Sequence, residues 1–339
     1  MTVTLGEGHT PLAASARIGP RLGASRLFFK LESCNPSGSY KDRFIAAALQ
    51  QVLDSGATSC VATSSGNTGS ALAAYCARYG VRAFILVNQD APAGKLTQMK
   101  AHGATVIRIP DFVTHPDVTQ RVFEILKQLS SERNLPFIVS AYRYCPEGMR
   151  GVESISGELH TALPDLRHVF VPVGGGGLYS AVVRGFGPAA PKVHAIQPAG
   201  CSTVVASFEE HRDEITPITS TTRVSGLSVP FDIDATRALG YLRACGGTGF
   251  ALRDEDIFAA QRMLLEEEGI FAEPAGAAAL AGWLQAVCRG IVPRDETAVC
   301  LVTGHGFKDP PSAEQAAARH ADVSASPFEI GDILGRLLP

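Results

Sequence analysis

The 339-residue sequence lacks several features that would assign it to particular classes of protein. It has no sustained run of basic residues and a formal net charge of −3, so it offers no electrostatic footprint for nucleic acid or a membrane surface. No uninterrupted apolar stretch is long enough to cross a bilayer. The first residues, MTVTLGEGHT, have neither the basic start nor the apolar core of a signal peptide. We therefore expect a cytoplasmic protein with no nucleic-acid or membrane partner.

Clustered cysteines are also missing. The eight cysteines are scattered, and no two of them stand at C-x-x-C spacing, whereas a zinc site or a disulfide framework would group them. Cys60 and Cys300 lie in apolar, strand-like runs, where a free cysteine acts as a small hydrophobic residue. We expect neither a metal site nor a disulfide framework.

What the sequence does have is a regular alternation of short apolar runs and helix-like stretches. The apolar runs predict buried parallel strands at 27–32, 59–63, 82–87, 105–109, 137–140, 168–173, 193–197 and 298–303. The helix-like stretches between them include 41–54, 67–79, 117–133, 254–268 and 275–288. This alternation predicts an α/β fold, with helices on both faces of mostly parallel sheets.

Four loops carry glycine where a predicted strand gives way to a helix, which is where α/β sheets bind their ligands. They are NPSGSYKDR at 35–43, SSGNTG at 64–69, GGGG at 174–177 and TGHGFKDP at 303–310.

The GGGG loop is suited to a phosphate group. Successive glycines let backbone N–H groups converge on one point, and the start of the following helix adds partial positive charge. No Lys-Ser or Lys-Thr follows, so this is not a Walker loop, and Tyr179 stands where the dinucleotide fingerprint requires glycine. The alternative is a tight turn packed against a sheet.

Lys41 stands at the start of a predicted helix, a position that usually attracts acidic residues because of the helix dipole. Partial burial and the positive helix end would both lower the pKa of a lysine there. A neutral amine is what Schiff-base chemistry requires. The alternative is an ordinary solvated lysine. Together, an activated lysine and a phosphate cradle suggest pyridoxal phosphate as the cofactor.

Six motifs in order resemble the fold-type II pyridoxal-phosphate enzymes over nearly the whole chain. They are EGHTPL at 7–12, FKLESCNPSGSYKDR at 29–43, SSGNTG, GGGGL, EPAGA at 273–277 and TGHGFKDP. Within that family, YKDR together with TGHGFKDP most resembles the short threonine synthases that have no N-terminal extension.

The resemblance implies a particular architecture. It is the tryptophan synthase beta-like class, with two three-layer α/β domains built on parallel sheets and the cofactor in the cleft between them. The smaller domain would comprise residues 36–145, and the larger one residues 1–35 plus 146–339. The resemblance also implies a homodimer.

The resemblance further assigns roles to individual residues. As the catalytic residue, Lys41 would hold pyridoxal phosphate in a Schiff base and then carry a proton. The other cofactor-binding residues would be Asn67 at the 3′-oxygen, Thr303 at the pyridine nitrogen, and Gly174, Gly175, Gly176, Gly177 and Leu178 at the phosphate. The substrate carboxylate would be received by Ser64, Ser65 and Thr68, although SSGNTG alone could be an ordinary capped helix start.

Two loops depart from the threonine synthase pattern. The family usually has N-P-x-R-x-E-G, whose arginine helps to grip the substrate phosphate; here the stretch is CPEGMRG at 145–151. A gapless match puts Gly148 on that arginine, and Arg150 would replace it if the loop is shifted. The plain GGGGL loop lacks a common asparagine and, like SGLSVP at 225–230, resembles serine and threonine dehydratases. Lys308 in TGHGFKDP, a motif that dehydratases usually lack, is a second candidate phosphate ligand or else a surface lysine.

The leading interpretation is a threonine synthase, which eliminates phosphate from the γ-carbon of O-phosphohomoserine and adds water at the β-carbon. Three alternatives stay open: a threonine or serine ammonia-lyase, a β-replacement enzyme acting on phosphoserine or another activated serine, and a non-catalytic cofactor-binding protein. The last predicts loss of Lys41 or of the loop hydroxyls, and all of them are present. Several basic side chains around the cavity in front of Lys41 would indicate a phosphorylated substrate.

Overall fold

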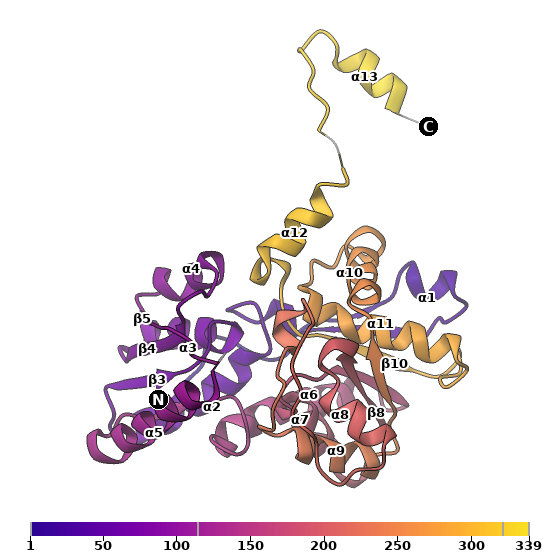
Figure 1. The fold of residues 1–339 in the computed structure, drawn as a ribbon. Coiled ribbons are helices and arrows are strands. Elements are labelled where there is room, and N and C mark those ends of the chain that lie inside the picture. Colours follow the sequence, from indigo (N-terminus) through magenta and orange to yellow (C-terminus); the bar gives the residue numbers. More distant parts are fainter. Residues whose placement is uncertain (1, 114, 321, 338–339) are drawn as a thin grey trace.

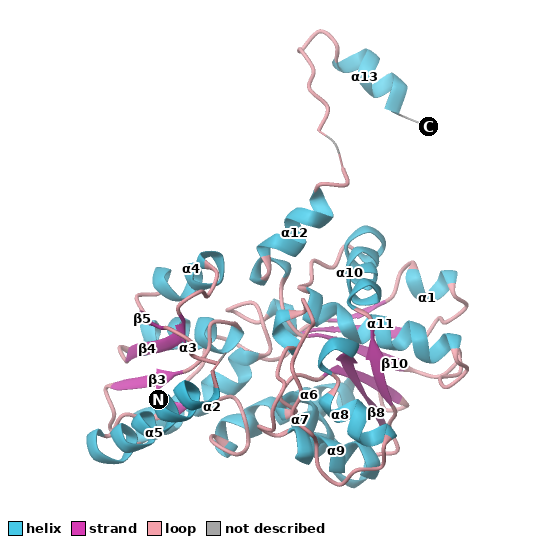
Figure 2. Ribbon diagram, in the orientation of Figure 1, coloured by secondary structure: helices cyan, strands magenta, loops and turns pink. Residues whose placement is uncertain are grey.

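Two separate parallel sheets organise the chain, as the computed structural model shows for residues 2–113, 115–320 and 322–337. The larger sheet has six strands in the order β1-β2-β10-β7-β8-β9, and the smaller has four in the order β5-β4-β3-β6. Figure 2 shows them side by side, each covered by helices. Every strand pair is parallel except β1 with β2. The predicted α/β fold with parallel sheets is confirmed.

The larger sheet is assembled from the two ends of the chain. Its strands are β1 (Leu12–Ala14), β2 (Leu27–Leu31), β7 (His168–Pro172), β8 (Lys192–Pro198), β9 (Gly249–Leu252) and β10 (Ala298–Val302). Its principal helices are α6 (Pro146–Ala162), α7 (Gly177–Phe186), α8 (Thr203–Glu209), α9 (Ala235–Ala244), α10 (Asp254–Glu268) and α11 (Pro274–Cys288).

This sheet is apolar on both faces because helices cover both. In β7, Val169 and Val171 belong to one core, which includes residues of α6, α7 and α9, whereas Phe170 between them belongs to another, which includes residues of α10 and α11. Alternation of side chains along a strand requires such a continuous apolar run in a sheet buried on both faces.

The smaller sheet lies within the middle of the chain. Its strands are β3 (Ser59–Ala62), β4 (Arg82–Asn88), β5 (Thr105–Ile109) and β6 (Phe137–Ile138). Its helices are α3 (Asn67–Tyr79), α4 (Ala93–Ala101) and α5 (Pro116–Arg133). All four strands fall inside the segment predicted as the smaller domain, and the domain boundaries themselves stay a prediction.

Helix α2 (Lys41–Asp54) joins the two parts. It packs against α3 of the smaller part and against α6 of the larger part. Its buried Phe44 and Leu49 share one core with residues of both. Helix α2, which begins at Lys41, is therefore held between the two parts.

The remaining elements are short. They are α1 (Ile18–Arg21), α12 (Pro310–Ala317), α13 (Ile330–Leu337) and the 3₁₀ turns η1 (Glu32–Cys34), η2 (Gly187–Ala189), η3 (Ala199–Cys201), η4 (Ser225–Leu227) and η5 (Gly306–Lys308). In Figure 1, α13 stands away from the body of the molecule at the end of an extended segment. Among the described residues, no helix is both long and apolar enough to cross a bilayer.

Candidate active site

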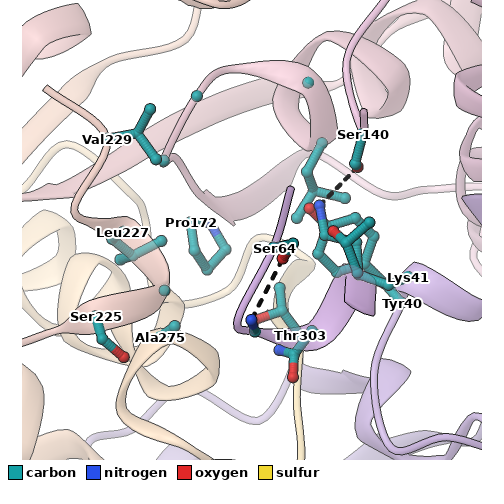
Figure 3. A pocket seen from close by; sticks show the side chains of 18 of the residues that line it. Tyr40, Lys41, Ser64, Ser140, Pro172, Ser225, Leu227, Val229, Ala275 and Thr303 are labelled. Atoms are coloured by element: carbon teal, nitrogen blue, oxygen red, sulfur yellow. Dashed lines mark hydrogen bonds between the residues drawn. The ribbon is translucent and has the colours of Figure 1, made fainter. Parts of the chain in front are cut away.

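A cavity of about 410 Å³ lies where the strands of both sheets end. Its walls come from the loops after β3, β6, β7 and β10, with the start of α2 between them. A volume of this size is typical of a small-molecule site, and the C-terminal edge of parallel strands is the usual position. In Figure 3, Lys41 and Ser140 lie on one side of this cavity, and Leu227 and Val229 lie on the other.

Lys41 points into the cavity from the first residue of α2. Its Nζ donates a hydrogen bond to Ser140 Oγ at 2.7 Å, drawn as a dashed line in Figure 3. Asp42 beside it is buried and accepts hydrogen bonds from Ser37 N and Oγ, at 2.9 and 2.6 Å. Burial raises the pKa of the Asp42 carboxyl even though these Ser37 donors lower it. The loop before α2 is thereby tied to the helix that carries the lysine.

The loop before α2 is also tied to the TGHGFKDP loop. Gly38 has a φ of 93°, which glycine adopts readily, and its carbonyl accepts a hydrogen bond from His305 N at 2.9 Å. Tyr40 N donates to Thr303 O at 3.1 Å. These main-chain contacts bring Thr303, which follows β10, to the same cavity as Lys41.

The GGGG loop connects β7 to α7 and lines the cavity. At Gly176, the third glycine of the loop, a residue with a side chain would not fit. Gly176 has a φ of 91°, and a Cβ atom there would lie 2.5 Å from Asp234 O. The Asp234 carboxyl accepts a hydrogen bond from Tyr142 N at 2.6 Å. The backbone N–H of Asp234 donates to Gly175 O at 2.9 Å. A glycine loop at the positive end of α7 could present its backbone N–H groups to a phosphate.

The SSGNTG loop, which connects β3 to α3, forms another part of the cavity wall. Ser64, Ser65, Asn67 and Thr68 all line the cavity. Helix α3 begins at Asn67, so its first backbone N–H groups have no partner within the helix and are available to an anion. Gly69 allows the first turn of α3 to lie close to Ser64, since a Cβ at position 69 would lie 2.3 Å from Ser64 O.

Lys308 also lines the cavity rather than lying on the open surface. Its Nζ donates to Gln98 Oε1 of α4 at 2.5 Å. Burial lowers the pKa of Lys308, although the nearby carboxyl groups of Glu273 and Asp42 favour its charged form.

Arg150 is the predicted site residue that the structure does not bring to the cavity. It lies on α6, its side chain is 61% exposed, and its guanidinium pairs with Glu147 at 2.8 Å. Gly148 packs against α2, where a Cβ would lie 2.6 Å from Phe44 Cε2. There is consequently no room for an arginine at position 148, and Arg150 does not take its place.

Ser140, Lys95 and Glu273 are among the cavity residues that were not assigned a role from the sequence. Ser140 follows β6, and Lys95 on α4 donates to Ser225 Oγ across the cavity at 2.7 Å. Glu273 precedes α11 and accepts a hydrogen bond from Asn67 Nδ2 at 2.8 Å. The position of Glu273 at the start of the EPAGA motif could have marked it as a site residue. Lys95 lies in none of the six motifs, so no sequence pattern indicated it.

The arrangement fits pyridoxal phosphate: a phosphate cradle and a lysine amine face one cavity of suitable size. No group of three or more His, Cys, Asp or Glu residues within the described ranges could hold a metal ion. The family described as "Pyridoxal-phosphate dependent enzyme" matches residues 3–304, and the chain belongs to that family. The predicted cofactor is confirmed as the one this family uses.

Several curated relatives of the chain carry the name threonine synthase. The chain is similar to that of Methanocaldococcus jannaschii, with 34% identity over 93% of this chain and 78% of the relative. It is likewise similar to that of Halalkalibacterium halodurans, with 30% identity over 92% of this chain and 86% of the relative.

Solved structures with the same fold carry other names. Maize serine racemase matches with a TM-score of 0.78 and 24% identity, covering 92% of each chain. The processed threonine deaminase isoform 2 of Solanum lycopersicum matches with a TM-score of 0.76 and 24% identity, over 91% of this chain and 87% of that one. At this identity they support the fold alone.

Proposed function

We propose that the protein is a threonine synthase, a lyase that converts O-phospho-L-homoserine and water to L-threonine and phosphate. The observation that carries this proposal is that Lys95 and Lys308 line the same cavity as Lys41. Two ammonium groups beyond the one that holds the cofactor are suited to a phosphorylated substrate, because charge-assisted hydrogen bonds to phosphate are strong. The similarity to proteins named threonine synthase agrees with this substrate.

In this proposal the residues of the chain bind and orient both molecules. Lys41 holds the cofactor and moves a proton at the substrate. When the Lys41 amine is not bonded to the cofactor, it donates a hydrogen bond to Ser140 Oγ. The cofactor phosphate is bound by Gly174, Gly175, Gly176, Gly177 and Leu178, its 3′-oxygen by Asn67 and its pyridine nitrogen by Thr303. The substrate carboxylate is bound by Ser64, Ser65 and Thr68. Pyridoxal phosphate supplies the electron sink for this chemistry.

An ammonia-lyase acting on threonine or serine is the second candidate. It is favoured because neither candidate position brings a guanidinium to the cavity. Arg150 lies outside the cavity lining, and Gly148 has no space for a side chain. A β-replacement enzyme acting on phosphoserine would use the same two lysines.

The test is a comparison of products from the purified holoenzyme. A threonine synthase releases phosphate and forms threonine from O-phosphohomoserine. An ammonia-lyase releases ammonia and a 2-oxo acid from threonine or serine. Phosphate release from phosphoserine that depends on an added nucleophile would identify the β-replacement enzyme. Ammonia release from threonine without phosphate release from phosphohomoserine would reject the synthase.

The domain division, the homodimer and the cytoplasmic location belong to the same proposal. The separate four-stranded sheet supports a smaller domain of residues 36–145, next to a larger one of 1–35 plus 146–339. Crystal structures with and without substrate should show the smaller domain moving as one body. Analytical ultracentrifugation measures the oligomeric state, and cell fractionation the location.

A further inference from the structure

Glu273 is a buried acid in the cavity wall that none of the roles above uses. Its Oε1 accepts a hydrogen bond from Asn67 Nδ2 at 2.8 Å. The described residues supply no other hydrogen bond to its carboxyl group. An ionised carboxylate that is buried with a single hydrogen-bond partner is costly in free energy. Taking up a proton reduces that cost.

The Glu273 carboxyl group is held in a tight slot. A Cβ atom at Gly304 would lie 2.1 Å from Glu273 Oε1 and 3.2 Å from Asn67 Nδ2, so only glycine fits beside the pair. Glu273 N donates to Gly304 O at 3.0 Å, which ties the acid to the loop that carries Thr303. The acid therefore has little freedom to turn away from Asn67.

Charged groups of both signs surround this carboxyl. Lys308 and Lys95 favour its ionised form, whereas Asp309 opposes it. Burial outweighs these charges and raises the pKa of Glu273 to about 7. Tyr40, Lys41 and Tyr179 also line this cavity. Asp42 follows Lys41 on α2, and burial raises the pKa of its carboxyl. Burial lowers the pKa of His305 in the TGHGFKDP loop. Glu273 can therefore gain or lose a proton near neutral pH.

The protonation state of Glu273 determines what Asn67 offers to the cavity. An ionised carboxylate only accepts hydrogen bonds, so the amide N–H must face it, as observed, and the amide oxygen is turned elsewhere. A protonated carboxyl can donate to the amide oxygen, which lets the amide present N–H instead.

We propose that Glu273 is a positioning residue that acts through Asn67, setting whether the amide turns its oxygen or its N–H toward the 3′-oxygen of bound pyridoxal phosphate. The proposal rests on the contact proposed above between Asn67 and the cofactor, and not on the identity of the substrate. An amide oxygen stabilises the protonated 3′-hydroxyl, and an N–H stabilises its ionised form. Protonation of Glu273 therefore favours an ionised 3′-oxygen.

The experiment follows the visible absorption of the bound cofactor in the substrate-free holoenzyme between pH 5.5 and pH 9. The wild-type spectrum should change with a midpoint near neutral pH. Glu273→Gln keeps the shape and the acceptor for Asn67 but cannot ionise, so its spectrum should lose this transition while cofactor content stays equal. Glu273→Asp, which keeps a titratable carboxyl, should retain it.

Two neighbouring substitutions test the same group without altering position 273. Asp309→Asn removes a negative charge that favours the protonated form, so the midpoint should move to lower pH. Lys308→Ala removes a positive charge, so it should move to higher pH. Asn also caps helices, so the hydrogen bond that Asp309 accepts from Ser312 N can persist.

The proposal requires the effect to pass through Asn67. In an Asn67→Ala background, Glu273→Gln should leave the spectrum unchanged. A Glu273→Gln enzyme that titrates like the wild type would overturn the proposal, as would an equal spectral effect with and without Asn67, or neither neighbour moving the midpoint. If these expectations hold but phosphohomoserine releases no phosphate, only the proposed function fails.

Discussion

The contact between Lys41 and Ser140 joins residues that are distant in the chain and places a hydroxyl beside the amine that we propose holds the cofactor. Substitution of Lys41 by alanine should reduce turnover by about 10³-fold or more, because the nucleophile and the proton carrier are lost together. Borohydride treatment of the wild type should bleach the visible band and attach the cofactor to the peptide containing Lys41. Lys100→Ala, at an exposed position of α4, is the matched control. Normal turnover by Lys41→Ala would disprove the assignment.

Lys95 and Lys308 are the residues whose charges should decide the substrate. In Lys95→Ala or Lys308→Ala, KM for O-phosphohomoserine should rise by about tenfold or more, and inhibition by free phosphate should weaken, because a charge-assisted hydrogen bond is lost. Cofactor content should change little, since we propose that backbone groups of the GGGG loop hold the cofactor phosphate. Steady-state kinetics with phosphate inhibition measures both effects.

Arg150→Ala is the control for this pair of lysines. Its guanidinium is exposed and paired with Glu147, so KM should stay within experimental error of the wild type. An unchanged KM in both lysine variants, or a raised KM in Arg150→Ala, would contradict the proposed phosphate site.

At the scale of elements, the GGGG loop depends on backbone conformation more than on side chains. Gly176→Ala should cost about 1–3 kcal/mol of stability, because a side chain is strained at a φ of 91° and would lie against Asp234 O. The shifted loop should also bind cofactor weakly. Thermal unfolding and the ratio of cofactor to protein measure the two effects.

Gly157→Ala is the matched glycine control. Gly157 lies in α6, and a Cβ there has nothing within 4 Å. Alanine should therefore stabilise the helix by about 0.5–1 kcal/mol and leave cofactor content unchanged. Equal cofactor content in Gly176→Ala and Gly157→Ala would show that the loop conformation is not needed.

The strength of the local signal separates the elements that sequence patterns predicted from those that they missed. The helices 41–54, 67–79 and 254–268 have the predicted bounds, because long stretches and terminal glycines define them. The predicted strand 137–140 is shorter, since β6 ends at Ile138 and frees Ser140 to face Lys41. Strands β1 and β9 were not predicted, because three or four residues are too few to show a period.

At the scale of the whole molecule, acid should destabilise the protein through two buried histidines of the larger sheet. His168 Nδ1 and His194 Nε2 are buried 3.0 Å apart at β7 and β8. Burial lowers the pKa of both, that of His194 to about 3. The unfolded chain takes up a proton at His194 as pH falls through 6.5, and the folded protein does so only near 3. Stability due to a neutral His194 is therefore present above pH 6.5 and is lost toward pH 3.

The measurement compares wild type with His194→Gln. Glu273 acts in the opposite direction, because its raised pKa lets the folded protein take up a proton, but the variant leaves Glu273 unchanged. Relative to the variant, the wild type should lose about 2 kcal/mol of unfolding free energy between pH 8 and pH 5. Denaturant unfolding at both pH values tests this, and parallel pH profiles would contradict it.

The sequence by itself determined the α/β class, the cofactor and the loops that line the cavity. Those properties depend on local features: apolar period, glycine where a strand meets a helix, and hydroxyls or a lysine at a helix start. Lys41, Asn67 and the GGGG loop could thus be proposed before their geometry was known.

Only the tertiary structure decided which charged groups share the cavity. Packing of α2 against α6 leaves no room at Gly148 and directs Arg150 outward, while α4 brings Lys95 to Ser225. The structure also buried Glu273 against Asn67, 206 positions apart in the chain. Such contacts arise from the way helices pack across two sheets, and a pattern of neighbouring residues carries no information about partners so distant in sequence.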